Sequence, residues 1–203
     1  NSPDIVTNSW TPWKLLPETT ITVSNLSTNT DAANTLVNVF TSSFGIGMKR
    51  IPLSTKIVNI GRGEKIEVKF PFSKEILDGD QSIGTHVVIN HTYDKNPNNN
   101  QGSQMIDGIV TSESGRDIEV EFPVLNRSGS MRQITLTILA HDFQNAFVSP
   151  NVHQFGPWEQ ITATLRFRVP NTFYDDKKHI TVIGLGSGGE LIDGLSYVVR
   201  IDD

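Results

Sequence analysis

The residues most able to do chemistry lie near the middle of the chain, where acidic and amide side chains alternate. In residues 94–104, DKNPNNNQGSQ, an oxygen-bearing side chain recurs at every second position, at Asp94, Asn96, Asn98 and Asn100. Calcium takes about six to eight oxygen ligands, so this spacing makes the segment a candidate calcium site. The glycine and the glutamate of a helix–loop–helix calcium loop are missing at their positions, however. The alternative is an asparagine-rich turn whose side chains cap its own backbone.

Large aromatic side chains suggest a second kind of site, a stacking surface for sugar rings. The candidates are Trp10, Trp13, Phe155 and Trp158. We expect Phe155 and Trp158 to be an exposed pair, because they lie in or beside residues 142–157, the longest stretch without alternation, and long loops are often functional. In the alternative, the tryptophans fill a core or close the end of a β-sandwich.

Other possible functional motifs are not supported by the residues around them. Residues 184–189, GLGSGG, have the glycine spacing of a dinucleotide-binding loop, but the residues that follow predict a strand where that site needs a helix. His86 and His91 are five positions apart on an expected strand, which puts them on opposite faces. The chain has no G-x-S-x-G motif, so a serine hydrolase has no positive support. We therefore predict that the protein is not an enzyme.

Composition limits the remaining classes of function. The chain has 203 residues, 36% hydrophobic and 19% charged, which is enough apolar material for packed cores. The net charge is −5 and the basic residues are scattered singly, which argues against a nucleic-acid partner. There is no cysteine, so disulfides and thiolate metal sites are excluded. No apolar run approaches the length of a membrane span, so we expect no membrane insertion.

The elements that must position these residues are strands. Residues 64–72, EKIEVKFPF, and 116–126, RDIEVEFPVLN, alternate apolar and polar side chains, which is the pattern of a half-buried strand. Further short strands are expected, separated by turn-forming residues, and no stretch has helical periodicity with a cap. This pattern predicts an all-β fold of immunoglobulin-like sandwiches.

The two halves of the chain follow a similar order, with Asn25 in the first corresponding to Asn126 in the second. We therefore predict two tandem immunoglobulin-like domains, residues 1–104 and 105–203, joined at the asparagine-rich segment. Residues 105–110 are expected to form one strand, which either closes the first sandwich or opens the second.

The first half resembles a known family. Residues 2–6 (SPDIV), 21–25 (ITVSN), 31–40 (DAANTLVNVF) and 83–100 together look like the bacterial cell-adhesion-related (CARDB-like) immunoglobulin-like domains. The resemblance covers about residues 2–102. The family's motif positions are matched by Val23, Asn25, Ala33, Val37, Val39, Asn99 and Asn100.

The resemblance implies a binding or spacer role outside the cytoplasm, at the cell surface or beyond it, and no catalytic site. We expect a non-enzymatic module of an exported bacterial protein, for adhesion, spacing or partner binding, without a cofactor unless calcium binds. Its partners would be other domains of a longer chain, a cell-surface protein or a glycan. The alternative is a carbohydrate-binding or accessory region of a secreted hydrolase.

Overall fold

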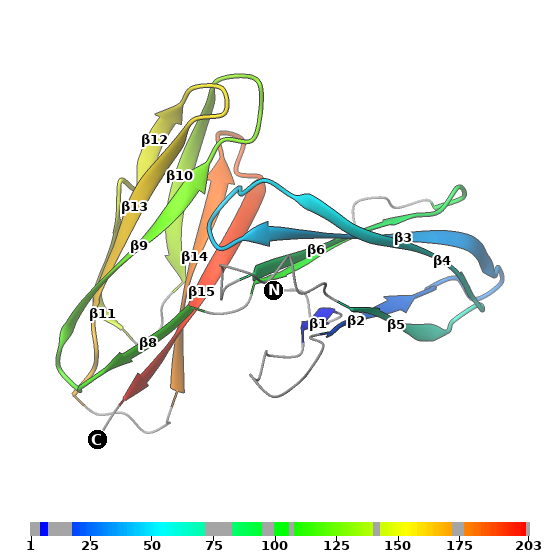
Figure 1. The fold of residues 1–203 in the computed structure, drawn as a ribbon, viewed down its shortest axis with the longest axis horizontal. Coiled ribbons are helices and arrows are strands. Elements are labelled where there is room, and N and C mark those ends of the chain that lie inside the picture. Colours follow the sequence, from blue (N-terminus) through cyan, green and yellow to red (C-terminus); the bar gives the residue numbers. More distant parts are fainter. Residues whose placement is uncertain are drawn as a thin grey trace. The chain divides into compact units, whose positions relative to one another are not determined.

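The computed structural model describes residues 5–7, 18–71, 83–94, 100–105, 108–139, 143–171 and 177–201. In these ranges the regular structure is β-strand, arranged in four sheets (Figure 1). The prediction of an all-β chain is confirmed. No helix in this part of the chain is long and apolar enough to cross a membrane.

The chain divides by its packing into two compact units. Unit 1 consists of Asn1–Ser42 and Arg50–Ile106, and unit 2 of Ser43–Lys49 and Asp107–Asp203. Whereas the sequence suggested one boundary after residue 104, the chain leaves unit 1 after Ser42, returns to it at Arg50, and leaves it again after Ile106.

Unit 1 contains seven described strands in two sheets, in which the pairs β1–β2, β2–β5, β3–β4 and β6–β7 are antiparallel. One sheet has the order β1-β2-β5 and the other the order β4-β3-β6-β7. The strands are β1 (Ile5–Thr7), β2 (Glu18–Ser24), β3 (Ala32–Ser43), β4 (Ile51–Ile60), β5 (Lys65–Pro71), β6 (Ile83–Asn90) and β7 (Gln101–Met105).

Alternation along these strands builds one core between the two sheets. Val68 and Phe70 on β5 are buried, whereas Glu67 before them and Lys69 between them are exposed, as expected for a strand with one face covered. The cluster takes residues from both sheets: Ile21, Val23, Val37, Val39, Ile60, Val68, Phe70 and Val87.

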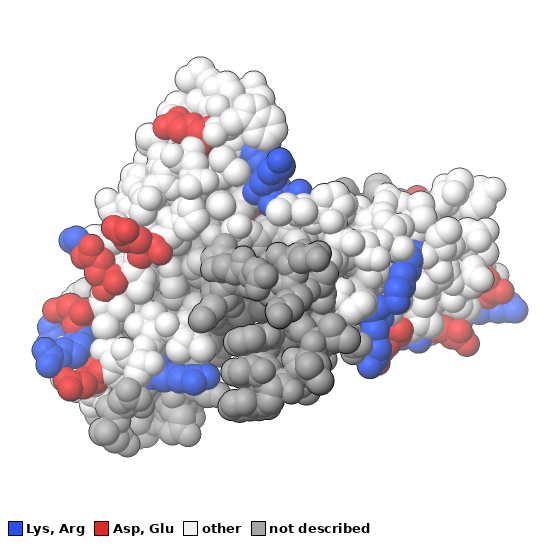
Figure 2. Space-filling view, in the orientation of Figure 1, with Lys and Arg blue, Asp and Glu red and all other residues white. Residues whose placement is uncertain are grey.

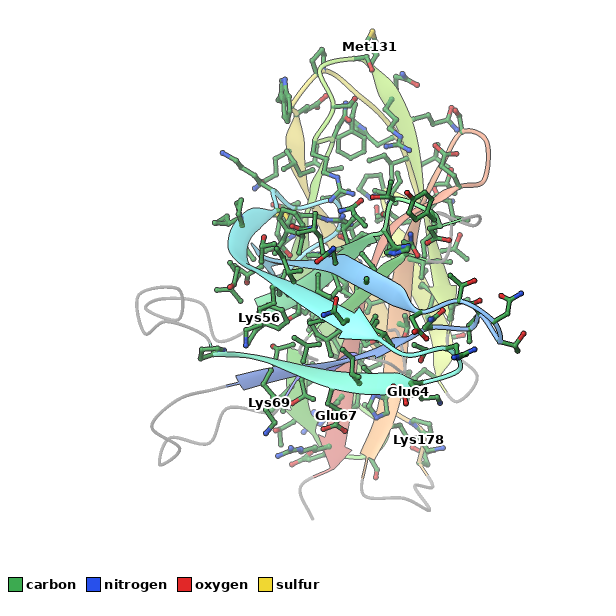
Figure 3. The ribbon with its side chains drawn as sticks, turned by 90° about the vertical axis from the view of Figure 1, so that its right-hand side faces the viewer. Lys56, Glu64, Glu67, Lys69, Met131 and Lys178 are labelled. Atoms are coloured by element: carbon green, nitrogen blue, oxygen red, sulfur yellow. The ribbon has the colours of Figure 1, made fainter. Side chains whose placement is uncertain are left out.

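One side of unit 1 is joined across its sheets by a lysine. Lys56 on β4 donates from Nζ to the carbonyl oxygen of Lys69 on β5 at 2.6 Å. Its ammonium group also lies 5.1 Å from the centre of the Phe70 ring, within cation–π range. Figure 3 shows Lys56 and Lys69 on the same side of the two strands.

Unit 2 also has two sheets, with the orders β11-β13-β9 and β12-β10-β14-β15-β8. The pairing is antiparallel except between β15 and β8, which run parallel. The strands are β8 (Gly108–Ser112), β9 (Asp117–Leu125), β10 (Arg132–Leu139), β11 (Gln144–Ser149), β12 (Val152–Phe155), β13 (Gln160–Arg168), β14 (Lys177–Gly186) and β15 (Leu191–Ile201).

The short segment Ser43–Lys49 completes the core of unit 2. The Ile46 amide donates to the Pro123 carbonyl at 3.0 Å, and the Leu125 amide donates to the Ile46 carbonyl at 2.9 Å, so the segment pairs with β9. The Ile46 side chain is fully buried, and its Cγ2 lies 2.6 Å from where a Cβ on Gly184 would stand. Position 184 therefore favours glycine, because a larger side chain there would collide with Ile46.

Two expectations about strands are corrected. Residues 105–110 are not one strand, because β7 ends at Met105 in unit 1 and β8 begins at Gly108 in unit 2. Residues 142–157, expected as a long loop, contain β11 and β12. A bulge between Gln144 and Phe147 interrupts the alternation along β11, which explains why the period was hidden.

Charged side chains of the described residues are mixed in sign on the face that Figure 2 shows. Several of them form exposed ion pairs across strands, such as Arg166 with Glu119 at 2.6 Å on β13 and β9. Exposed pairs of this kind add little stability, because solvent screens them and side-chain entropy opposes them. Stability must therefore come mainly from the two buried cores.

The packing of Ile46 predicts that a residue from the first quarter of the chain stabilises unit 2. Replacing Ile46 by alanine should cost roughly 2–5 kcal/mol, the usual range for a buried isoleucine. Hydrogen exchange should show reduced protection in β9 and β14, whereas Ile21→Ala, the matched change in the core of unit 1, should affect β2 and β5. Loss of protection in unit 1 alone for Ile46→Ala would contradict the assignment.

Candidate functional site

An open cavity lies at one end of unit 1. It has a volume of about 940 Å³. Two connections line it, residues 25–31 between β2 and β3 and residues 91–100 between β6 and β7, of which 95–99 are outside the described residues. A third connection, residues 61–64 between β4 and β5, is hydrogen-bonded to the first. Loops that cluster at one end of a β-sheet scaffold often carry recognition residues.

The cavity has an apolar floor and a polar rim. Its floor is the end of the core, formed by aliphatic side chains of both sheets: Ile21, Val23, Ile60, Val87 and Ile89. Its rim carries hydroxyl, amide and carboxylate groups from the connections, among them Ser27, Asn29, Asp31, Asp94 and Asn100. The cavity therefore suits a group that is apolar at its inner end and can form hydrogen bonds at its outer end.

One side of the rim is ordered by the β6–β7 connection. Tyr93 is 82% exposed and meets the His91 ring edge-on, with 6.1 Å between ring centres. Asn100 donates from Nδ2 to Oδ2 of Asp94 at 2.5 Å, and its carbonyl accepts from the Ile89 amide at 2.8 Å. The two ends of this connection are thus tied together, and Tyr93 projects from it into solvent.

The opposite part of the rim depends on Asn25, which links the other two connections. Its Nδ2 donates to the carbonyl oxygens of Thr30 at 2.8 Å and of Gly61 at 3.2 Å, while its Oδ1 accepts from the Ser27 amide at 3.0 Å. The backbone N–H of Asn25 also donates to the Glu64 carbonyl oxygen at 2.9 Å. One side chain therefore satisfies backbone groups of both connections that would otherwise face each other unpaired.

Unit 2 repeats this arrangement at Asn126. Its Nδ2 donates to the carbonyl oxygens of Ser130 at 2.8 Å and of Gly156 at 2.7 Å, and its Oδ1 accepts from the Ser128 amide at 3.1 Å. The backbone N–H of Asn126 donates to the Glu159 carbonyl oxygen at 2.9 Å. We call these two sets of bonds the asparagine clamps of units 1 and 2.

The turns that the clamps hold also correspond. In unit 1 the Gly63 amide donates to the Ser27 carbonyl at 2.8 Å, and in unit 2 the Trp158 amide donates to the Ser128 carbonyl at 3.1 Å. Both turn residues have positive φ, +68° for Gly63 and +59° for Trp158. Glycine adopts this conformation freely, but a bulky side chain in it is an outlier.

The turn of unit 2 is held by a carboxylate. Glu159 accepts from the Gly156 amide at 2.5 Å, and its other oxygen lies 3.3 Å from Nε2 of His153. The bond from the Gly156 amide, followed by the contact with His153, lowers the pKa of Glu159 below its ordinary value, because both favour the charged form. His153 in turn meets the Phe155 ring edge-on, with 4.7 Å between ring centres.

The aromatic residues predicted to bind sugar have different environments. Trp158 is 63% exposed, whereas Phe155 is 1% exposed and belongs to the core, so the expected exposed pair is corrected to a single ring. Phe155 is at the end of β12 with its side chain inward, and Trp158 lies on the following turn. Trp10 and Trp13 lie outside the described residues.

The residues predicted to bind calcium are only partly described. Asp94 and Asn100 are brought together at the cavity rim, but by a hydrogen bond between their own side chains. Asn96 and Asn98 lie outside the described residues. Among the residues that are described, no group of three or more histidine and acidic side chains is placed to hold a metal ion. Calcium binding stays a prediction.

A serine and a histidine do meet inside unit 1. The Ser42 hydroxyl lies 2.9 Å from Nε2 of His86, on neighbouring strands β3 and β6. Their exposed fractions are 2% and 1%. A substrate cannot reach this hydroxyl, so the contact joins two strands in the interior.

Sequence reasoning matched Asn25 with Asn126 but missed the clamps and the cavity. A signal was available, because Asn-x-Ser at residues 25–27 is followed by Gly-x-x-Glu at residues 61–64, and the same two motifs recur at residues 126–128 and 156–159. Comparison with known families finds no family model that matches the chain, and comparison with curated proteins finds no match.

The clamps predict unequal effects of the same substitution. The Asn126 side chain is 1% exposed and its bonds are part-buried, so Asn126→Ala should leave partly buried carbonyl groups unpaired beside a new cavity and cost about 2–3 kcal/mol. Asn25 is partly exposed, so water can replace its bonds and Asn25→Ala should cost only about 1 kcal/mol. Urea denaturation measures both. Asn126→Asp should be at least as damaging as alanine, because a carboxylate oxygen would face two carbonyl oxygens.

The lowered pKa of Glu159 predicts a dependence of stability on pH. A carboxylate with a lowered folded-state pKa stabilises the fold fully above its unfolded-state pKa, and that contribution is lost as the pH falls through the folded-state value. Glu159→Gln should therefore lower the melting temperature at pH 7, and the difference from the natural protein should shrink toward pH 3. Glu67→Gln, the same charge change in unit 1, is the control. A difference that stays constant with pH would refute this role.

Proposed function

We propose that the chain is a non-enzymatic module of two tandem immunoglobulin-like domains, which binds a partner through the connections at the cavity end of unit 1. The cavity of about 940 Å³ carries this proposal, because an apolar floor with a hydrogen-bonding rim is the usual composition of a recognition site. The role is adhesion, spacing or the presentation of a partner.

The strand order supports the immunoglobulin-like assignment. In unit 1 the sheets β1-β2-β5 and β4-β3-β6-β7 place the first, second and fifth strands opposite the others, as in a Greek-key sandwich. In unit 2, β9 pairs with β13 in one sheet, and β10, β14 and β15 are adjacent in the other. The matching asparagine clamps support a duplication, since they join corresponding connections in the two units.

A binding role without catalysis agrees with the hydrogen bonds that the acidic side chains of the rim already form. The Asp94 carboxylate accepts from Asn100, and Asp31 accepts from the Arg62 amide at 3.0 Å, so both acids are engaged in shaping the loops. Among the described residues of these connections, Tyr93 and Leu26, at 82% and 77% exposure, offer apolar surface to a partner. Exposed aromatic and aliphatic anchors beside polar groups are typical of binding sites.

The partner is best described by its chemistry. We expect an apolar side chain or chain end that enters the cavity, carried by a neighbouring domain of a longer chain, a cell-surface protein or a glycan-bearing surface. The resemblance of residues 2–102 to cell-adhesion-related domains supports an exported bacterial protein and an extracellular site of action.

The cavity can be tested without knowing the partner. Anilinonaphthalene sulfonate, an amphipathic probe, should shift the methyl NMR signals of Ile21 and Ile89 saturably, because these side chains line the cavity. The signals of Ile134 and Ile180 in the core of unit 2 are the internal control. Ala32→Phe, which places a ring at the cavity wall, should abolish the shifts. Equal shifts in both units, or none, would refute the proposed site.

A further inference from the structure

The turn at Trp158 in unit 2 carries a side chain that the fold does not require. The same turn in unit 1 has Gly63 at the corresponding position, with a similar positive φ and the same backbone hydrogen bond to the β2–β3 connection. Unit 1 therefore shows that glycine is sufficient to make this turn. A tryptophan there costs free energy in the backbone, because its Cβ is crowded at positive φ.

Packing of the Trp158 side chain offsets little of this backbone free energy. The Trp158 side chain is 63% exposed, so most of its ring stays in contact with water. Its Nε1 lies 3.8 Å from where a Cβ on Gly129 would stand, which places one edge of the ring against the β9–β10 connection. A strained backbone that displays an exposed ring indicates a functional constraint.

Hydrogen-bonding groups lie on the β9–β10 connection that the ring contacts and on the residue next to it in the turn. The β9–β10 connection provides the Ser128 and Ser130 hydroxyls, whose oxygens are 3.3 Å apart, and Ser130 is exposed. The partly exposed Glu159 carboxylate is the next residue after the ring. Two of the acidic groups at this end of unit 2 have partners, Glu159 with His153 and Glu190 with Arg132 at 2.5 Å, and Nη1 of Arg127 is buried without a hydrogen-bond partner. A flat ring among hydroxyls and paired charges suits an uncharged polar ligand with an apolar face.

We propose that Trp158, with the Ser130 hydroxyl and the Glu159 carboxylate beside it, is a stacking site for the pyranose ring of a neutral saccharide. The C–H groups on one face of a pyranose are weakly positive and match the negative face of the indole, while its hydroxyls need donors and acceptors at the ring edge. The inference rests on the proposed binding function and names a ligand class for the second unit.

A bilayer surface is the competing ligand. Met131 is 67% exposed and stands at the end of the β9–β10 connection (Figure 3), so two exposed apolar side chains occur on adjacent connections. Adsorption to a membrane normally combines such side chains with unpaired basic residues. Arg132, the residue after Met131, is paired with Glu190 instead, and Nη1 of Arg127 on the same connection is buried and so is turned away from a bilayer surface. This favours the saccharide.

The test uses the full chain and four defined probes: cellohexaose, chitohexaose, maltohexaose and mannohexaose. Calorimetric titration should show saturable binding to at least one of them. Trp158→Gly should weaken that binding tenfold or more, and Trp158→Phe should weaken it less, because a smaller ring face remains. Trp158→Gly should also raise the melting temperature, since glycine relieves the positive φ. Loss of binding then cannot come from unfolding.

Several results would overturn the saccharide site. They are no binding to any of the four probes, equal binding by Trp158→Gly, or a marked fall in melting temperature for that variant, which would make the ring structural. Cosedimentation with phosphatidylcholine vesicles that depends on Trp158 would assign the ring to a bilayer instead. Ala32→Phe should leave saccharide binding unchanged, so failure of the unit 1 cavity and failure of this site give different results.

Discussion

The structure depends on satisfying the backbone groups where two connections meet at one end of each unit. A sheet pairs its own amides and carbonyls, but the connections between strands leave theirs turned toward one another. In each unit one asparagine resolves this, because its side-chain nitrogen donates to carbonyl groups of both connections and its side-chain oxygen accepts from a backbone N–H. Asparagine is suited to this position since it has both donors and an acceptor on a short side chain.

With the clamp in place, the rest of each end is free to differ. Unit 1 uses its end to border a cavity whose floor is the core itself, and unit 2 uses the same turn to display Trp158. Gly63 and Trp158 occupy matching places with nearly the same φ, so the backbone is kept while the side chain changes. Separation of a fixed scaffold from variable loop positions is the arrangement that lets sandwiches acquire binding sites.

Alternation in the sequence located the strands whose pattern is regular. β5 and β9 agree with the predicted residues 64–72 and 116–126 to within one or two positions, because one face of each is buried and the other is not. β11 escaped because its bulge, with Asn145 at φ of +53°, shifts the pattern within a strand of six residues. Phe155 was misplaced for a related reason, since the short β12 has too few residues to show a period.

The site was less predictable than the strands. The clamp joins Asn25 to Thr30 and Gly61, and contacts at such separations leave no periodic signal. The asparagine-rich segment drew attention by composition, yet its described side-chain contribution to the rim is the Asp94–Asn100 bond, and the exposed Tyr93 comes just before it. Composition shows which groups are present, but their roles depend on which backbone groups lie within reach.

The segment Ser43–Lys49 has a consequence for modularity. Because it belongs to unit 2 while its flanking strands belong to unit 1, unit 2 is not one continuous stretch of polypeptide. A cut after Ile106 would separate Ile46 from β9, removing the partners of the Pro123 carbonyl and the Leu125 amide and uncovering Gly184. The two units therefore cannot be exchanged or recombined as independent cassettes by a single crossover, and they are expected to be inherited together.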